Sequence, residues 1–172
     1  MAENRIELRE VAKLVEELRP IRVGLISFDG CDGAGKTTLA EQISSSLRTP
    51  MIDLDKFVAP ETGEFVNALD LVTLVQELDA ALASSPVVLL SGVCMRQVLE
   101  TINRNAVVGV YVQRNTRAGL PGDIDYIDVE SGVEASADVL ELFDELNLEV
   151  YAYHRAYRPR TNSDLIFIRE AD

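Results

Sequence analysis

The feature that most constrains the fold of this chain is a glycine-rich segment at residues 30–37, GCDGAGKT, which matches the pattern G-x-x-x-x-G-K-[ST] in full. Residues 22–29 before it form a short, mostly apolar run that is typical of a buried strand. Residues 35–47 after it carry apolar side chains at helical spacing. Backbone N–H groups of such a loop and the positive end of the following helix both face an anion. The segment therefore predicts a phosphate-binding loop between a strand and a helix.

The side chains of this loop suit a nucleoside triphosphate. Lys36 can place a positive charge on the β- and γ-phosphates, and the Thr37 hydroxyl can coordinate Mg²⁺. We therefore expect ATP as the phosphate donor and Mg²⁺ as the cofactor; the choice between ATP and GTP stays open, although the chain has no N-K-x-D guanine motif. The expected nucleotide-binding residues are Gly30, Cys31, Asp32, Gly33, Ala34, Gly35, Lys36, Thr37 and Thr38.

The rest of the chain alternates short apolar runs with helical patterns, which indicates an α/β fold with a parallel sheet and one domain over residues 1–172. Strands are expected at 22–29, 51–54, 87–90, 106–113 and 165–168. Helices are expected at 5–18, 35–47, 69–82, 95–102 and 135–157, the last being the longest. Residues 115–134 break the pattern with glycines and acidic residues, and they are expected to be a functional or mobile loop.

Two carboxylates, Asp53 and Asp55, stand at the C-terminal end of the second expected strand. Ligands of open α/β sheets bind beyond the carboxyl ends of the strands, and strand alternation would place both side chains on one side. We expect Asp53 to hold Mg²⁺ together with Thr37, and Asp55 to accept the proton of an attacking hydroxyl. Ser91 ends the third expected strand, where an acid that holds Mg²⁺ commonly stands, and this shifts more of that role to Asp53 or Asp29.

Two groups of basic residues stand out against the acidic background. Arg114 and Arg117 follow the fourth expected strand and are candidates for neutralising the γ-phosphate from a closing loop; a solvated loop is an equal alternative. Arg155, Arg158 and Arg160 end the last expected helix, where cations are favoured by the helix dipole. The single histidine, His154, is given no catalytic role.

Composition narrows the class of partner. The net charge is −13, which disfavours binding to nucleic acid phosphates. No segment approaches the ~20 apolar residues of a membrane span, and no apolar signal-peptide core follows the first residues, so a cytoplasmic protein is expected. The two cysteines, Cys31 and Cys94, make neither a disulfide framework nor a zinc site. The oligomeric state stays open, and a homo-oligomer is one of the alternatives.

With these residues in place, the chain resembles uridine kinases and their bacterial uridine kinase-like relatives. The strand and loop ISFDGCDGAGKTTLAEQI carries most of the resemblance, and shorter segments follow in the family's order. Residues 55–57 (DKF) resemble the D-x-F segment whose aspartate is the catalytic base, and 91–94 (SGVC) resemble the turn after the third strand. Arg114 to Arg117 stands where the lid arginines begin, and residues 153–159 and 163–165 resemble the end of the last helix and the start of the last strand.

The resemblance implies a three-layer P-loop NTPase fold of the kinase type, with a five-stranded parallel sheet in the order 2-3-1-4-5 and helices on both faces. It implies an N-terminal helix within residues 1–20 and a lid or acidic loop at 114–134. It also implies transfer of the ATP γ-phosphate to the hydroxyl of a small-molecule acceptor, most simply a nucleoside, with Phe57 lining the acceptor pocket.

Two other functions remain open. The acceptor could be another small metabolite, as in shikimate- or gluconate-type kinases, because residues 53–55 (DLD) also resemble shikimate kinase. The chain could instead be a nucleotide-binding switch with little phosphotransfer, which the serine at position 91 favours.

Overall fold

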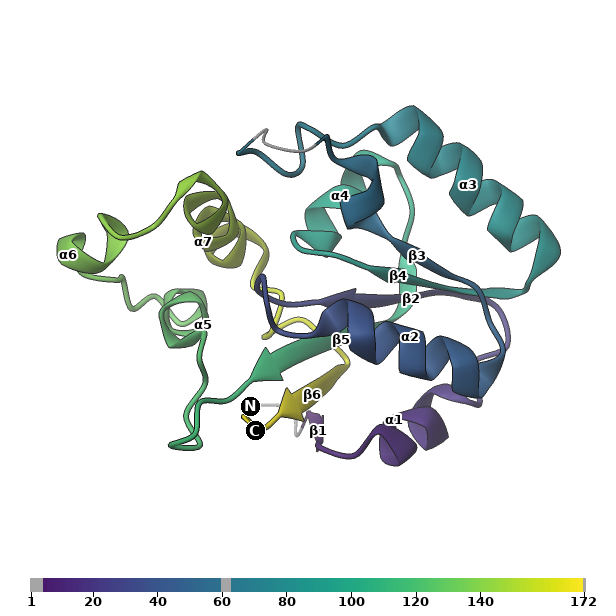
Figure 1. Cartoon of the computed structure of the whole chain (residues 1–172), viewed down its shortest axis with the longest axis horizontal. Helices are drawn as coiled ribbons and strands as arrows, with labels where there is room; N and C mark the ends of the chain where they lie inside the picture. Colours follow the sequence, from purple (N-terminus) through teal and green to yellow (C-terminus); the bar gives the residue numbers. More distant parts are fainter. Residues whose placement is uncertain (1–4, 60–62, 172) are drawn as a thin grey trace.

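Six parallel strands form one sheet in the order β1-β6-β5-β2-β4-β3 (Figure 1). The structure, a computed structural model, describes residues 5–59 and 63–171. The strands are β1 (Ile6–Leu8), β2 (Gly24–Asp29), β3 (Met51–Asp53), β4 (Val87–Ser91), β5 (Ala106–Arg114) and β6 (Leu165–Arg169). The five predicted strands are β3, β4, β2, β5 and β6 in the predicted 2-3-1-4-5 order, and the predicted α/β fold is confirmed.

Helices cover both faces of this sheet. They are α1 (Val11–Leu18), α2 (Lys36–Leu47), α3 (Leu71–Ser84), α4 (Met95–Thr101), α5 (Ile124–Glu130), α6 (Ala137–Leu140) and α7 (Glu145–Tyr157), with a 3-10 turn, η1 (Leu54–Phe57). Alternate residues of β2 and β4 point to opposite faces. Ile26 and Leu89 pack with α1 and α2, whereas Leu25 and Val88 pack with α3, α4 and α7. In Figure 1, α5, α6 and α7 lie together beyond the end of the sheet where the loop after β2 turns into α2.

The number of strands and the N-terminal helix differ from the prediction. Residues 6–8, expected to be helical, pair as an edge strand with β6 in the register Ile6–Leu165 to Leu8–Phe167, and the helix begins only at Val11. The apolar stripe that predicted the helix comes from residues that do lie in α1, such as Leu14 and Leu18. Residues 6–8 form a strand because their backbone pairs with the otherwise open edge of β6. The spacing of apolar residues along the sequence gives no information about such pairing.

Two further predictions are corrected in the C-terminal half. The expected loop 115–134 contains helix α5, and the expected long helix 135–157 is divided into α6 and α7. The division comes from Asp144, whose side chain accepts a hydrogen bond from the Asn147 backbone N–H at 2.7 Å and caps the start of α7. The longest helix is α3, with 14 residues.

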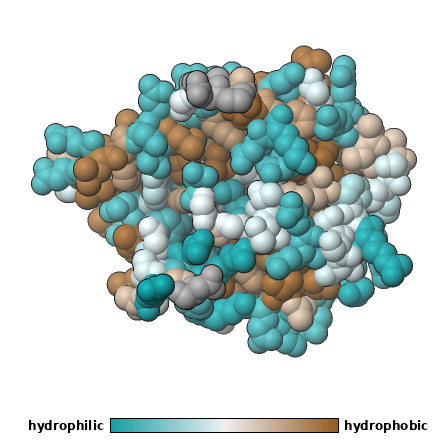
Figure 2. Space-filling model, viewed as in Figure 1, coloured by the Kyte–Doolittle hydropathy of each residue, from teal (hydrophilic) through white to brown (hydrophobic). Residues whose placement is uncertain are grey.

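The surface carries apolar side chains beside its polar majority (Figure 2). The exposed ones include Val133, Leu142 and, on α7, Leu148. Among the helices of the described residues, none has the length and apolar content needed to cross a membrane.

Candidate active site

The glycine-rich segment forms a tight loop between β2 and α2, as the sequence predicts. Gly30, Gly33 and Gly35 have positive φ angles of 145°, 72° and 86°. At Gly30 the loop passes so close to β5 that a Cβ would lie 2.4 Å from the Val112 carbonyl oxygen. Backbone with this curvature turns successive N–H groups to one side, which makes an anion-binding hollow in front of α2.

Lys36 lies inside this loop. Its side chain is 7% exposed, and Nζ donates a hydrogen bond to the Cys31 carbonyl oxygen at 2.6 Å. The ammonium group is therefore held over the first half of the loop, next to the place where phosphate oxygens would lie.

The predicted metal-binding pair lies on the β3 side of the loop. Thr37 Oγ1 donates to Asp53 Oδ2 at 3.3 Å, and Asp53 Oδ1 accepts from the Asp55 backbone N–H at 3.1 Å. Strand β3 ends at Asp53, and Asp55 lies in η1, so the expected strand alternation does not relate the two carboxylates. The short turn brings them together instead.

The Asp55 carboxyl is the expected proton acceptor. Partial burial, and then the charge of Asp53, raise the pKa of Asp55, while the charge of Lys36 acts in the opposite direction. Phe57, expected to line an acceptor pocket, is 8% exposed and packs in the apolar cluster with Phe65 and Leu69. Its ring therefore anchors the turn that carries Asp55.

Ser91 ends β4 in the middle of this edge of the sheet, opposite Phe28 of β2 and Asp53 of β3 in the strand register. It is fully buried, and within the described ranges its hydroxyl oxygen has no hydrogen-bond partner. Asp53, the register partner of Ser91, accepts from Thr37, so Thr37 and Asp53 give two neighbouring oxygen ligands, the ligand type that Mg²⁺ prefers. These residues fit a Mg²⁺ ion with its water shell.

Two arginines contact the loop from the opposite side, where β5 and β6 end. Arg114 and Arg169 are paired in the strand register. Arg114 Nη1 is 3.5 Å from the Gly33 carbonyl oxygen, and Arg169 Nη1 donates to the Gly35 carbonyl oxygen at 2.9 Å. Arg117, the second predicted arginine, is exposed on the turn that follows Arg114. Arg169 was missed by sequence reasoning because one arginine at the end of an apolar strand gives no signal.

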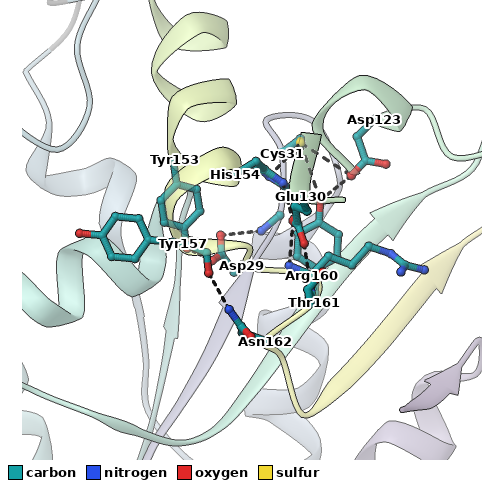
Figure 3. Close-up of polar contacts among 12 residues, drawn as sticks. Asp29, Cys31, Asp123, Glu130, Tyr153, His154, Tyr157, Arg160, Thr161 and Asn162 are labelled. Carbon is teal, nitrogen blue, oxygen red and sulfur yellow. Dashed lines mark hydrogen bonds and ion pairs between the residues drawn. The ribbon is translucent and has the colours of Figure 1, made fainter. Parts of the chain in front are cut away.

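A buried polar cluster contacts Cys31 of the loop (Figure 3). The sequence patterns did not predict it. His154 Nδ1 and Glu130 Oε1 are 2.7 Å apart, and both side chains are 1% exposed. The other ring nitrogen of His154 is 3.8 Å from Cys31 Sγ. Asp123 Oδ2 accepts from the Tyr111 hydroxyl at 2.5 Å and lies 3.7 Å from the same sulfur. The cluster joins α5, α7 and β5 to the second residue of the loop.

The pKa values in this region follow from burial. Burial raises the pKa of the Cys31 thiol, and the charge of Asp123 adds to this, so the thiol stays protonated. Burial also raises the pKa of Asp29, although its carboxylate accepts hydrogen bonds from the Gly30 N–H, at 2.8 Å, and from the Tyr153 hydroxyl (Figure 3). Asp29 therefore braces the start of the loop against α7.

The basic residues at the end of α7 have structural contacts. Arg155 pairs with Glu134 at the surface, and Arg160 Nε donates to Gln113 Oε1 at 2.9 Å. The His154 ring is held by Glu130 inside the fold.

A cavity of about 410 Å³ opens beside the loop, between Cys31–Ala34 and the helices α5 and α7. Its lining is Cys31, Asp32, Gly33, Ala34, Arg114, Asn115, Thr116, Gly122, Asp123, Tyr126, Asn147, Val150 and Ala171. It is large enough for a small ring compound next to the phosphate-binding hollow.

Comparison with known proteins identifies the class of this fold. No family profile and no curated protein matches the chain. Among solved structures, it is similar to a protein of Bacillus stearothermophilus described as a possible uridine kinase, with a TM-score of 0.59 and 15% identity, covering 91% of this chain and 96% of that one. It is also similar to a protein of Silicibacter sp. TM1040 provisionally described as a fructose transport system kinase, with a TM-score of 0.54, 14% identity, and coverage of 91% and 98%. The chain thus has the fold of P-loop kinases.

Proposed function

We propose that this protein is an ATP- and Mg²⁺-dependent small-molecule kinase that transfers the γ-phosphate to a hydroxyl group, in the first instance of a nucleoside. The observation that carries the proposal is the grouping of Lys36, the Thr37–Asp53 pair and Asp55 around one glycine loop at the carboxyl edge of the sheet. Phosphoryl transfer depends mainly on positioning and charge stabilisation, and this group supplies both.

The loop binds the triphosphate through its backbone N–H groups and the N-terminal end of α2. Lys36, held at the Cys31 carbonyl, needs only a small side-chain movement to exchange that oxygen for the β- and γ-phosphate oxygens. Arg114 stands next to Gly33 and can add positive charge to the transferring group, with Arg117 on the following turn.

Thr37 and Asp53 are the residues that would hold Mg²⁺. The ion, when bound, neutralises negative charge on the β- and γ-phosphates. In the structure the Thr37 hydroxyl is already directed at Asp53, which keeps both oxygens on the same side of the loop.

Asp55 orients the acceptor hydroxyl and takes its proton. Partial burial, and then the charge of Asp53, raise the pKa of Asp55, and its carboxylate can accept a proton from a hydroxyl. The turn that carries it is fixed by buried Leu54 and Phe57, so the carboxylate is held near Lys36 without blocking the loop.

The nucleoside acceptor is supported by the resemblance to uridine kinases and by a solved structure of the same fold described as a possible uridine kinase. A sugar is the nearest alternative, because another similar structure carries a fructose kinase description. Shikimate or gluconate would be acceptors with a negative charge.

The replacement Asp55→Asn tests the assignment. It should leave ATP binding, measured by calorimetry with Mg²⁺, unchanged and should lower phosphate transfer to uridine by about 10²–10⁴-fold, the usual contribution of a general base. Asp138→Asn is the matched control, because Asp138 is exposed on α6, and its turnover should equal that of the wild type. Undiminished transfer by the Asp55 variant would remove this role.

A second function, a nucleotide-binding switch with little transfer, is favoured by one observation. The position at the end of β4 holds the uncharged Ser91 rather than an acid. ATP binding without any acceptor that accelerates ADP formation would support the switch, and transfer to uridine or a sugar would exclude it.

A further inference from the structure

A second cavity, of about 460 Å³, opens on the face of the sheet that α3, α4 and α7 cover. Its floor includes Ser27 of β2 and Gly109 of β5, which are partners in the strand register. Side chains alternate along a strand, so Leu25 and Tyr111 flank this pair on the same face. Two small residues between larger ones leave space above the sheet. We call this space the α4 cavity, because α4 and the residues that follow it form one wall.

The α4 cavity is separate from the proposed phosphotransfer site. None of its lining residues belongs to the phosphate-binding loop or to the cavity beside that loop. The wall opposite α4 includes Tyr157, at the end of α7, and Asp164, just before β6. The Tyr157 carbonyl oxygen accepts from Asn162 Nδ2 at 2.9 Å (Figure 3), and its ring stacks on that of Tyr153. This wall is therefore held in place by the fold.

The hydroxyl of Ser27 is a buried polar group on the floor of the α4 cavity. Ser27 is 6% exposed, and among the residues that the structure describes its side chain has no hydrogen-bond partner. Its oxygen borders the cavity and is not enclosed by protein atoms, in contrast to that of Ser91. Buried polar groups of native proteins are almost always hydrogen-bonded. A partner for this hydroxyl therefore has to come from within the cavity.

Asp164 supplies a second unused oxygen beside Ser27. Its Oδ2 accepts from the Gly109 backbone N–H at 2.7 Å, and Oδ1 makes no hydrogen bond within the described ranges. A Cβ on Gly109 would lie 3.5 Å from Ser27 Oγ and 3.7 Å from Asp164 Oδ2. One ligand atom just above Gly109 is thus within reach of both side chains. A ligand hydroxyl at this point can donate to the carboxylate and accept from the serine.

The charges that line the α4 cavity balance each other. The lining holds two arginines, Arg96 and Arg104, and two carboxylates, Glu100 and Asp164. Arg104 Nη2 also pairs with Asp79, at 3.0 Å, outside the lining. A phosphate group would therefore meet no excess of positive charge, whereas hydroxyl groups, which both donate and accept, can bond to either kind of side chain.

We propose that the α4 cavity binds the ring of a neutral sugar, either a free monosaccharide or the ribose of a nucleoside, through Ser27 and Asp164. The site is additional to the proposed phosphotransfer site and does not depend on it. One ring hydroxyl lies above Gly109, between Ser27 and Asp164, and the other hydroxyls have Arg96 and Asn105 of the lining as partners. A volume of about 460 Å³ is within the usual range of small-molecule sites.

The test is an NMR titration of the isotope-labelled full chain, followed at the backbone amides of residues 27 and 109. The probes are D-ribose, uridine, L-serine and inorganic pyrophosphate. Gly109→Ala places a methyl group where the ligand hydroxyl would lie, at ordinary contact distances from its neighbours, so this variant should fold. Ser27→Ala removes only the hydroxyl. Ser84→Ala is the matched control, because its hydroxyl is exposed on α3 outside the cavity.

We expect saturable shifts at these two amides with D-ribose and uridine. The dissociation constant should rise at least tenfold in Gly109→Ala and about threefold to tenfold in Ser27→Ala, where one hydrogen bond is lost. Ser84→Ala should match the wild type. Tighter binding of uridine than of D-ribose would identify a nucleoside as the source of the ring, and equal binding would show that the sugar ring alone is recognised.

Three results would overturn the proposal. They are the absence of saturable shifts at these amides with both sugar probes, affinities that Gly109→Ala and Ser27→Ala leave unchanged, and tighter binding of L-serine or pyrophosphate than of the sugars at this place. None of these measurements uses ATP, so failure of the proposed phosphotransfer would leave their outcome intact.

Discussion

Replacing Glu130 by glutamine should remove a buried charge that accepts hydrogen bonds from three groups. Glu130 is the last residue of α5, and its carboxylate accepts hydrogen bonds from three groups of the chain that follows. His154 Nδ1 is 2.7 Å from Oε1, and the backbone N–H groups of Arg160 and Thr161 are 3.1 Å and 2.8 Å from the two oxygens. The side chain thereby ties α5 to α7 and to the segment that leads into β6.

The expected cost follows from burial. Both side chains of the Glu130–His154 pair are 1% exposed, so water cannot replace the lost interactions. A hydrogen bond to a charged group contributes roughly 1.5–3 kcal/mol, and breaking a buried pair costs about 3–5 kcal/mol because one partner is left buried and unpaired. Glutamine keeps one acceptor oxygen, so we expect Glu130→Gln to lower the free energy of unfolding by about 3 kcal/mol.

Glu134→Gln is the matched control. Glu134 also pairs with a residue of α7, Arg155, but these side chains are each 56% exposed. An exposed pair contributes about 0–1 kcal/mol. Urea denaturation of the two variants and the wild type, with a shared m-value, measures both losses. Equal losses in the two variants, or a loss under about 1 kcal/mol for Glu130→Gln, would refute the reasoning.

The same pair gives a pH dependence of stability. Burial opposes ionisation of Glu130, but the hydrogen bonds from His154 and Thr161 outweigh it and lower the pKa below the ordinary value of 4.5. The unfolded chain therefore takes up this proton at a higher pH than the folded one, and the stabilisation is present above 4.5 and is lost as the pH falls through the lowered pKa. The difference in unfolding free energy between wild type and Glu130→Gln should shrink in that window. A constant difference down to acid unfolding would contradict it.

Two further predictions concern the glycine loop. Arg169→Met should weaken MgATP binding about tenfold, because the guanidinium supports the Gly35 carbonyl at 2.9 Å and adds positive charge there, and Arg169→Lys should recover part of the loss; equal affinities in a calorimetric titration would contradict this. Gly30→Ala should lower the unfolding free energy by more than about 3 kcal/mol, since the new methyl group would meet the Val112 carbonyl oxygen at 2.4 Å. In Gly33→Ala the new methyl group has no neighbour within 4 Å, so the unfolding free energy should fall only by the roughly 1–2 kcal/mol that a positive φ costs. Similar losses of unfolding free energy in both variants, measured by urea denaturation, would rule out the steric explanation.

Local sequence patterns were sufficient to predict the elements whose conformation depends on residues close together in the sequence. The strand, loop and helix around residues 30–37 can be read from composition and spacing alone, because phosphate binding needs glycines, a lysine and a helix start within a few residues. Strands β2 and β4 are near-continuous apolar runs because they are buried on both faces. Resemblance to a kinase family added the order of the strands, which spacing does not contain.

Short-range sequence patterns failed to predict the elements whose ends are set by a single capping side chain or by pairing with a strand edge. Residues 6–8 pair with β6, although the apolar residues after them indicated a longer helix. Asp144 starts a new helix inside a stretch with continuous helical periodicity. A capping hydrogen bond and an open strand edge each contribute free energy comparable to the helical propensity of several residues, so they override a weak periodic signal.

The sequence by itself determined the phosphate-binding loop and the strands that surround it. Only the tertiary structure decided which distant residues contact the loop. Arg169 contacts Gly35, and Asp123 and His154 contact Cys31. Asp123 and His154 are separated from Cys31 by 92 and 123 positions in the sequence. Such contacts depend on how β5, β6, α5 and α7 pack together, and packing energies are summed over many small contacts that no short segment encodes.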